Sequence, residues 1–411
     1  MKAVYVPWLH MHQPMVWHNG KLVSNLEKMI SSPDSKESWE AKLMARAYKN
    51  PAKYVLELSE KGYKPKIMLD FSGVLLESLA SLGDRLEKVE VHGEVIGDII
   101  SLYKEVMSKY PDAIEFAGTA YSHCYFPATP EDDWSLQIEE WRNVFKDLFG
   151  QKHLKSVKGF WLPEMGVPAK EKVAHLIRLL NDAKYEWMFL PIEALKGEKY
   201  LGFEQRVMLT SQPHYIEADG EKFPIVFKVK YDFIDQQAGC DANGVYQKAL
   251  IAARIFNSNK PALVVPASDG ENGNVMMNEF FPNTFVPFFT TQHKDVGSMT
   301  ITEFLKKYYS EKGRIEPLSK VELSHEGASW LGGHESWLSG DRRIEMKKKL
   351  EELSREFHKI KNPNKRMIRA LLLAETSCYV YWNMDYWFSQ GEEMIKYAKS
   401  VLKSSSSQNM K

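Results

Sequence analysis

The sequence predicts an α/β protein, because short apolar runs typical of buried strands alternate with segments of helical periodicity. The strand-like runs are 2–8, 66–71, 114–118, 156–162, 186–190, 225–230 and 262–267. Apolar residues at three- and four-residue spacing predict helices over 39–61, 94–110, 135–149, 169–183 and 243–257. About seven strands joined by helices favour an incomplete (β/α)7 barrel.

The strand signal fades after residue 298, and the rest of the chain has helical periodicity. We expect helices over 300–312, 342–361, 366–385 and 390–403. The predicted organisation is therefore a barrel over 1–298, a C-terminal helical domain over 299–403 and a disordered tail over 404–411.

The charge balance argues against a polyanionic partner. The 411 residues contain 54 Lys and Arg against 54 Asp and Glu. Such a chain has no net field to attract nucleic acid or an anionic membrane surface, so a neutral substrate is expected. The oligomeric state is not predicted.

Cysteine usage and hydropathy indicate the compartment. Cys124, Cys240 and Cys378 are far apart and lack a Cys-x-x-Cys spacing, so neither a disulfide framework nor a zinc knuckle is indicated. No signal peptide precedes the first strand and no apolar stretch is long enough to span a bilayer. We expect a cytoplasmic protein, unless a leader has been removed, with no cofactor and no metal ion.

Two acidic segments end predicted strands. Pro163 cannot donate a ladder hydrogen bond, so it should stop the strand and leave Glu164 at the carboxyl-terminal rim. The run before Asp269 ends in the same way, on an Asp-Gly turn. One such residue alone is more often a solvated turn, but two in matching context at a barrel rim favour a site. Two carboxyl groups are what glycosidic bond hydrolysis needs.

Histidines and aromatic residues near other strand ends complete the candidate site. His10 and His12 lie on one face of the first strand by alternation, where imidazoles suit sugar hydroxyls or equally a metal ion. Tryptophans offer flat rings to the apolar face of a pyranose, and glycines allow close backbone approach. The predicted substrate-binding residues are His10, His12, Gln13, Trp17, His123, Trp161, Glu271, Trp330, Gly333 and Trp337.

Several segments resemble, in order and spacing, the motifs of glycoside hydrolase family 57. They are His12-Gln13-Pro14, the 118–123 segment, Gly159-Phe160-Trp161-Leu162-Pro163-Glu164, Asp269-Gly270-Glu271-Asn272, Ser329-Trp330-Leu331-Gly332-Gly333 with Trp337, and Ala374-Glu375-Thr376-Ser377. The resemblance therefore spans nearly the whole chain.

This resemblance implies an incomplete (β/α)7 barrel followed by a helical domain, acting on α-glucans with retention of anomeric configuration. Glu164 matches the nucleophile and Asp269 the general acid and base. Within the family the chain looks most like α-amylases and amylopullulanases. Two positions depart from the pattern: Cys124, where proline is frequent, and Cys378, where aspartate is common, which leaves specificity near the leaving group open.

Three alternatives remain open. A 4-α-glucanotransferase shares the first half-reaction, and neither the α-1,4 against α-1,6 preference nor the chain-length preference follows from the sequence. A metal-dependent amidohydrolase could use His10, His12, His123, His214 and Asp269 as ligands, but it leaves Glu164 without a role. A glucan-binding protein without turnover is the third, and Cys378 keeps it open.

Overall fold

Seven parallel strand segments form the centre of the molecule. The computed structural model describes residues 1–229, 241–272, 279–316 and 318–406. Hydrogen-bonded pairing gives the order β13/β14, β1/β2, β5, β8, β9, β10, β12. The bounds are β1 Ala3–Tyr5, β2 Trp8–Met11, β5 Ile67–Phe71, β8 Ile114–Phe116, β9 Gly159–Trp161, β10 Trp187–Leu190, β12 Glu221–Phe227, β13 Ala262–Val264 and β14 Ala267–Asp269. The predicted α/β class and strand set are confirmed; residue 230 of the expected strand 225–230 lies outside the described residues.

Two pairs of neighbouring strands in the barrel are joined by few backbone contacts. Between β8 and β9 the contact is an isolated parallel bridge from Gly118 to Phe160. Between β12 and the β13/β14 segment, the Val229 N–H donates to the Val265 carbonyl at 3.1 Å. In the described part of the chain each of these two strand pairs is joined by one bridge or one backbone hydrogen bond, and in this sense the barrel is incomplete.

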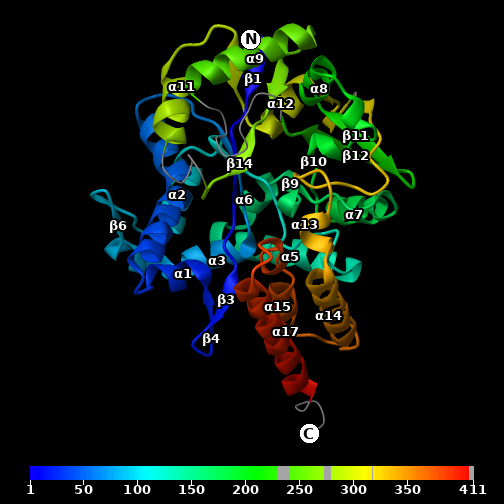
Figure 1. Ribbon diagram of the computed structural model, residues 1–411. Helices are drawn as coiled ribbons and strands as arrows, with labels where there is room; N and C mark the ends of the chain where they lie inside the picture. The colour runs from blue at the N-terminus through cyan, green and yellow to red at the C-terminus, as the bar shows by residue number, and fades with distance from the viewer. Residues whose placement is uncertain (230–240, 273–278, 317, 407–411) are drawn as a thin grey trace.

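Helices cover the outside of the strands, as Figure 1 shows. They are α2 Ser35–Glu60, α3 Gly73–Leu82, α4 Ile99–Lys109, α5 Trp134–Phe149, α6 Gln151–Ser156, α7 Lys170–Asp182, α8 Phe203–Thr210 and α9 Ala242–Phe256. The expected helix 94–110 starts later, because β7 (Glu94–Val95) pairs with β6 (Glu90–Val91) and the Asp98 side chain caps α4.

Shorter elements decorate this frame. They are the hairpin β3 (Met15–His18) and β4 (Lys21–Ser24), α1 Asn25–Ile30, β11 His214–Ala218, α11 Val286–Thr290, β15 Val296–Ser298, β16 Ser310–Glu311, β17 Arg314–Ile315 and β18 Ser319–Lys320, with short 3-10 helices at Gly83–Lys88, Glu131–Asp133, Pro163–Met165, Ile192–Ala194 and Glu198–Tyr200 and a π-helical turn at Phe281–Phe285.

The helix α12 (Ile301–Tyr308) packs on the barrel strands. The Thr302 hydroxyl donates to Glu115 at 2.5 Å and accepts from the Trp187 indole at 3.0 Å. Ile301 and Phe304 lie in the same buried cluster as Trp8 and Trp187. The expected helix 300–312 therefore ends early, at the β16–β17 hairpin.

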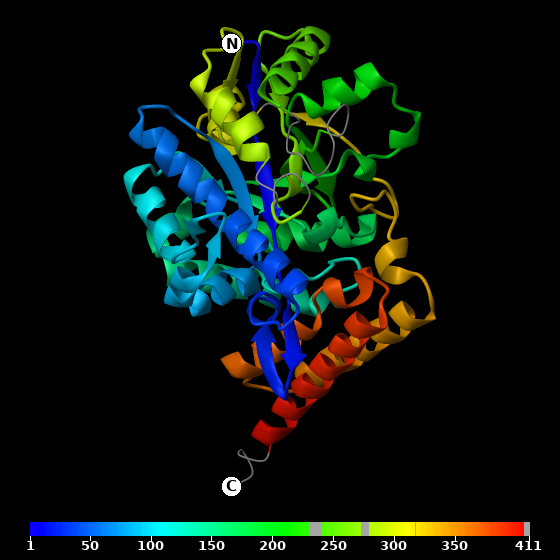
Figure 2. The same cartoon turned by 60° about the vertical axis from the view of Figure 1, so that its left-hand side comes forward.

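The remaining helices form a bundle below the barrel, next to the β3–β4 hairpin (Figure 2). They are α13 Glu335–Leu338, α14 Asp341–Phe357, α15 Lys365–Ala374, α16 Cys378–Tyr381 and α17 Asp385–Ser406. The expected helix 366–385 is broken, because the Ser377 N–H bonds the His123 carbonyl and Thr376 pairs with Cys124. Of the predicted tail, α17 covers 404–406 and residues 407–411 lie outside the described part.

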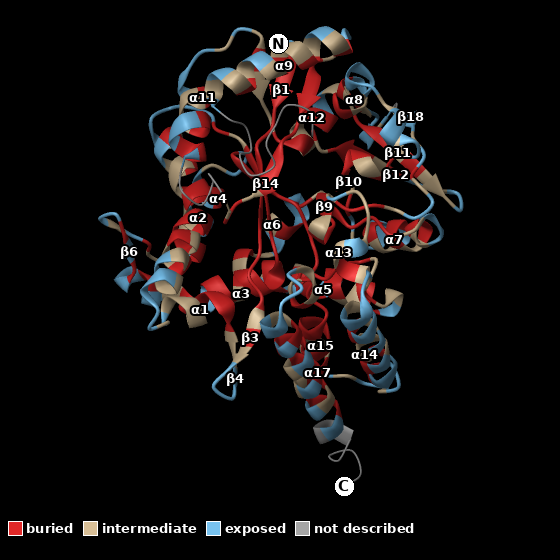
Figure 3. Cartoon of the chain, in the orientation of Figure 1, coloured by how far each residue is buried: buried red, intermediate tan, exposed pale blue. Residues whose placement is uncertain are grey.

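Large aromatic side chains fill the interior of the barrel. Trp8 stacks on Phe189 with ring centroids 4.5 Å apart. It also contacts Trp161 in a tilted arrangement and Trp187 edge-on. All four are buried, and Figure 3 shows the strands as the most buried part of the chain. A ligand site must therefore lie above these aromatic side chains, at the strand ends.

Among the described helices, none is both long and apolar enough to cross a membrane.

Candidate active site

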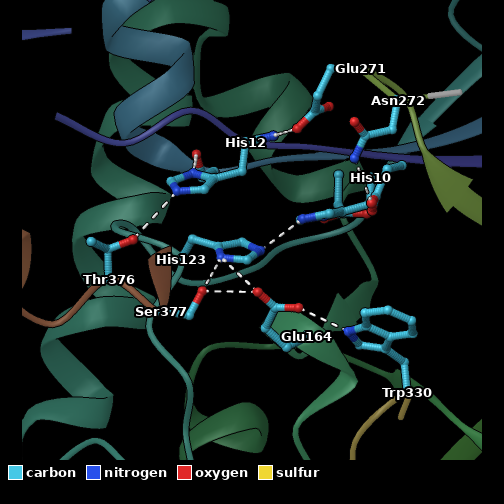
Figure 4. A network of polar contacts seen from close by, with 12 residues as sticks. His10, His12, His123, Glu164, Glu271, Asn272, Trp330, Thr376 and Ser377 are labelled. Carbon is cyan, nitrogen blue, oxygen red and sulfur yellow. Dashed lines mark hydrogen bonds and ion pairs between the residues drawn. The ribbon is translucent and has the colours of Figure 1, made fainter. Parts of the chain in front are cut away.

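Glu164 sits on a strained turn directly after β9. Pro163 ends the strand and Glu164 adopts φ 55° and ψ 17°, the left-handed region that a residue with a Cβ rarely occupies. Such a conformation costs on the order of 1–3 kcal/mol and concentrates at functional sites. It turns the carboxylate toward two donors: the Trp330 indole N–H at 3.0 Å from Oε2 and the Ser377 hydroxyl at 3.0 Å from Oε1 (Figure 4).

The Glu164 carboxylate shares its electrostatic environment with Asp269. Burial raises the pKa of Glu164, the bonds from Trp330 and Ser377 and the His10 charge lower it, and the Asp269 charge raises it further. The net direction is upward. The charges of Glu164 and Asp269 are therefore close enough to influence each other.

A chain of hydrogen bonds connects Glu164 to a buried aspartate. Asp70 Oδ2 lies 2.5 Å from His10 Nδ1, His10 Nε2 lies 2.8 Å from His123 Nε2, and His123 Nδ1 lies 2.9 Å from Ser377 Oγ. Ser377 completes the chain to Glu164.

The protonation states of His10 and His123 determine which atom donates in each of these hydrogen bonds. Burial lowers the pKa of His10, but the charge and hydrogen bond of Asp70 outweigh it and raise that pKa to about 9. Burial and the two neighbouring imidazoles hold the pKa of His123 well below its usual value. A doubly protonated His10 donates to Asp70 and to His123, so the neutral His123 carries its proton on Nδ1 and donates to Ser377. The Ser377 proton then points at Glu164.

The imidazoles form a stack against Trp161. His10 is nearly parallel to the Trp161 ring at 5.2 Å between centroids, and His12 lies 4.2 Å from His123 with an interplanar angle of 6°. His12 contacts Ser72 at 2.7 Å and Thr376 at 3.4 Å. Burial and the His10 charge keep the pKa of His12 well below its usual value. The site therefore offers one cationic and two neutral imidazoles.

The second acidic corner follows β14. The register pairs Asp269 with His10, and the Asn272 amide donates to Asp269 Oδ2 at 3.1 Å. Little room is left for a side chain at Gly270, because a Cβ there would lie 2.4 Å from Met11 Cε and 2.8 Å from Met11 Cγ. The close approach of β2 and β14 thus holds Asp269 at the rim.

Glu271 is a buried acid. Its Oε1 accepts the His12 backbone N–H at 3.0 Å, and its Oε2 is buried without a hydrogen-bond partner among the described residues. Burial, then the Asp269 charge, raises the pKa of Glu271 to about 8. Glu271 is therefore protonated near neutral pH and holds a proton that it can donate.

The loop 329–333 brings Trp330 to Glu164. The Ser329 hydroxyl donates to the Gly333 carbonyl, the turn between them places Gly332 at φ 98°, and the Trp330 N–H bonds the Glu164 carbonyl at 3.3 Å. The site is thus built from both the barrel and the chain beyond it.

Three of the predicted substrate-binding residues have other contacts. Gln13 accepts from Asn25, and Trp337 is buried and stacks on Tyr125 at 4.3 Å. Trp17 lies on the β3–β4 hairpin, where its backbone bonds Gln390. Gly333 shapes the loop that carries Trp330. Within the described part of the chain, Gln13, Trp17 and Trp337 form hydrogen bonds or ring contacts with residues other than Glu164 and Asp269.

The sequence analysis missed Asp70 and Ser72. Asp70 accepts from the Trp8 indole at 2.6 Å and pairs with His10; Ser72 holds His12. The available signal was a lone aspartate in the apolar run 67–71. A completely buried acid needs a partner, so that pattern indicates a buried ion pair.

The amidohydrolase ligand set is not assembled. His214 bonds Ser319 and the Leu209 carbonyl, which lie outside the histidine stack. A different group of ligand-type side chains, His12, His123 and Cys378, has its ligand atoms within 4.8 Å of one another.

A cavity of about 550 Å³ lies elsewhere, between the β3–β4 hairpin, α3 and α15. Glu77, Tyr121 and Arg369 line it, and their hydrogen bonds and ion pair occupy its polar groups. None of the four carboxyl groups of the candidate site lines this cavity.

A parallel α/β barrel with paired carboxyl groups at the strand rim defines a hydrolase-type site. The chain belongs to glycosyl hydrolase family 57, whose model matches residues 6–312. No protein with curated annotation matches it.

Solved structures share the fold at low identity. The 4-α-glucanotransferase from Thermococcus litoralis is 16% identical with a TM-score of 0.67; the match covers 97% of this chain, which spans 60% of that protein. The exo-type maltose-forming amylase from Pyrococcus sp. ST04 is 13% identical with a TM-score of 0.68, covering 100% of this chain and 81% of that one. The α-amylase from Thermotoga maritima is 14% identical with a TM-score of 0.62, covering 98% and 93%.

Proposed function

We propose that the protein is a retaining glycoside hydrolase acting on α-glucans, with α-amylase-type cleavage of α-1,4 bonds. The observation that carries the proposal is the strained Glu164 corner, whose carboxylate receives two hydrogen bonds and feels the Asp269 charge. Family membership and the α-glucan enzymes among its structural neighbours support the substrate class.

In the proposed reaction Glu164 attacks the anomeric carbon while Asp269 protonates the departing glycosidic oxygen. This forms a covalent glucosyl-enzyme and frees the leaving glucan. Asp269 then takes a proton from water, and the resulting hydroxide-like oxygen displaces Glu164 with a second inversion. Ser377 and Trp330 orient the attacking carboxylate, and His10 and His12 are placed to meet sugar hydroxyls.

Transfer to a sugar hydroxyl is the second candidate, favoured by the fold shared with the 4-α-glucanotransferase. The two reactions diverge only in the acceptor that enters after the first step. Incubation with one defined linear maltooligosaccharide separates them, since hydrolysis gives only shorter products and transfer also gives longer ones.

The nucleophile assignment is tested by Glu164→Gln, with Glu217→Gln as a matched control. Glu217 lies on β11 and pairs with Lys320 on the exposed face. Glu164→Gln should abolish turnover yet retain glucan binding by calorimetry, and the control should keep parental activity. Cleavage near the parental rate by Glu164→Gln would refute the assignment.

The expectation of a cytoplasmic protein accords with the free thiols of Cys124 and Cys378.

A further inference from the structure

Three ligand-type side chains from distant parts of the chain meet beside the nucleophile. His12 follows β2, His123 follows β8, and Cys378 begins α16. Their ligand atoms lie within 4.8 Å of one another. The stretch 376–378 joins this group to the catalytic site, because Thr376 contacts His12 and Ser377 bonds both His123 and Glu164.

We propose that His12, His123 and Cys378 form an inhibitory site for a thiophilic divalent cation, with Zn²⁺ as the best fit. Two imidazoles and a thiolate are soft donors that suit Zn²⁺, whereas Mg²⁺ and Ca²⁺ require oxygen ligands. Three protein ligands leave one tetrahedral position for water. On binding, the Cys378 S–H bond breaks, a sulfur–metal bond forms and the proton leaves to solvent.

The side chains need a small rearrangement to close on an ion. Zinc–nitrogen bonds of about 2.0–2.1 Å and zinc–sulfur bonds of about 2.3 Å place tetrahedral ligands about 3.4 to 3.6 Å apart. The lone pairs of imidazoles lie in the ring plane, so the parallel rings of His12 and His123 must turn. His12 is the less restrained of the two, because its Nε2 makes only the 3.4 Å contact to Thr376.

The ion competes with the hydrogen-bond chain that ends at Glu164. Both ring nitrogens of His123 are engaged, one with His10 and the other with Ser377. Ligation through Nδ1 would break the bond to Ser377, and ligation through Nε2 would break the bond from His10, so either mode interrupts the chain between Asp70 and Glu164. A positive ion in the stack also neutralises part of the nucleophile's charge. Metal binding should therefore suppress turnover.

Cobalt titration of the full-length, metal-stripped protein tests the site without requiring activity. Co²⁺ bound to a thiolate gives a near-ultraviolet sulfur-to-metal band. We expect this band at about one equivalent in the parent protein and in a Cys124→Ser/Cys240→Ser double variant, and its loss in Cys378→Ser. His12→Ala should weaken Co²⁺ binding at least about tenfold. Absence of the band in the parent, its persistence in Cys378→Ser, or unchanged affinity in His12→Ala would each overturn the proposal.

A second experiment measures inhibition of glucan cleavage by Zn²⁺. Zn²⁺ should lower the glucan-cleaving rate of the parent and the double variant at least about tenfold and that of Cys378→Ser less than about twofold. Equal inhibition of all three would contradict the site. If the protein cleaves no glucan, the function proposed above fails while the cobalt band still decides the metal site.

Discussion

The Ser377 hydroxyl donates to Glu164 Oε1 at 3.0 Å while accepting from His123 Nδ1 at 2.9 Å. The serine therefore links the hydrogen bonds of the buried histidines to the proposed nucleophile: it accepts from His123 and donates to Glu164. Because Ser377 lies between α15 and α16, the C-terminal region contributes a side chain to the proposed site.

Ser377→Ala should lower kcat by about 10- to 100-fold, the equivalent of a lost hydrogen bond to a charged group. KM should change little, since the bond orients Glu164 and is not proposed to touch substrate. Ser377→Thr keeps the hydroxyl and should restore most of kcat. Steady-state kinetics on one maltooligosaccharide measures both; equal losses in Ala and Thr would indicate a packing defect.

Trp330→Phe should also lower kcat by about tenfold or more, because it removes the indole N–H but keeps an aromatic ring. The lost donor should raise the pKa of Glu164 further, so the acidic limb of the kcat profile should move to higher pH. An unchanged limb would show that the indole does not stabilise the ionised nucleophile.

The Asp70–His10 pair should cause a further loss of activity at alkaline pH in metal-free buffer, beyond the loss caused by deprotonation of the general acid. The folded-state pKa of His10 is raised to about 9. Its cation is therefore present at neutral pH and lost as pH rises through about 9, and the stability that it contributes is lost over the same window above its unfolded value of about 6.5. kcat/KM should fall there.

Asp70→Asn removes the charge that holds the His10 proton, so the alkaline limb should move to lower pH by at least about one unit. Ser78→Ala on α3, whose hydroxyl bonds its own helix, serves as the control and should leave the limb in place. A limb unmoved by Asp70→Asn would remove His10 from the account.

The acid and base role is decided between Asp269 and Glu271. Asp269→Asn should reduce cleavage of glucans by about 1000-fold or more and spare an aryl glucoside with a good leaving group. Added azide should then rescue deglucosylation. Glu271→Gln preserves a donor next to His12 and should cost about tenfold; the reverse ranking would give the proton to Glu271.

Gly270→Ala should destabilise the protein, because its Cβ would meet the Met11 side chain at 2.4 Å. Overpacking of this kind costs about 1–3 kcal/mol in free energy of unfolding. Gly202→Ala is the matched control, since its nearest neighbour is at 3.7 Å and its φ is negative. Chemical denaturation of both variants measures the difference; equal stability would contradict the close approach of β2 and β14.

The strand ends could be predicted from the sequence because their signals are local. The strand before Pro163 ends one residue before its expected end at 162, and the strand before Gly270 ends two residues after its expected end at 267. The alternation that placed His10 and His12 on one face also holds, since both join the histidine stack.

Long-range contacts could not be predicted in this way. Nothing local shows that the partner of Asp70 is His10, or that Trp337 is buried under Tyr381. The expected helix 366–385 breaks because bonds to His123 and Cys124 outweigh helical propensity at 375–377.

Trapping of the glycosyl-enzyme would identify the nucleophile by covalent labelling. The protein would be incubated with a fluorinated α-glucosyl fluoride that forms the intermediate quickly and releases it slowly, then digested and sequenced by mass spectrometry. We predict one glucosyl adduct, carried by Glu164 and absent from Glu164→Gln. An adduct on Asp269 or Glu271, or turnover with no adduct and inversion at the anomeric carbon, would contradict the account.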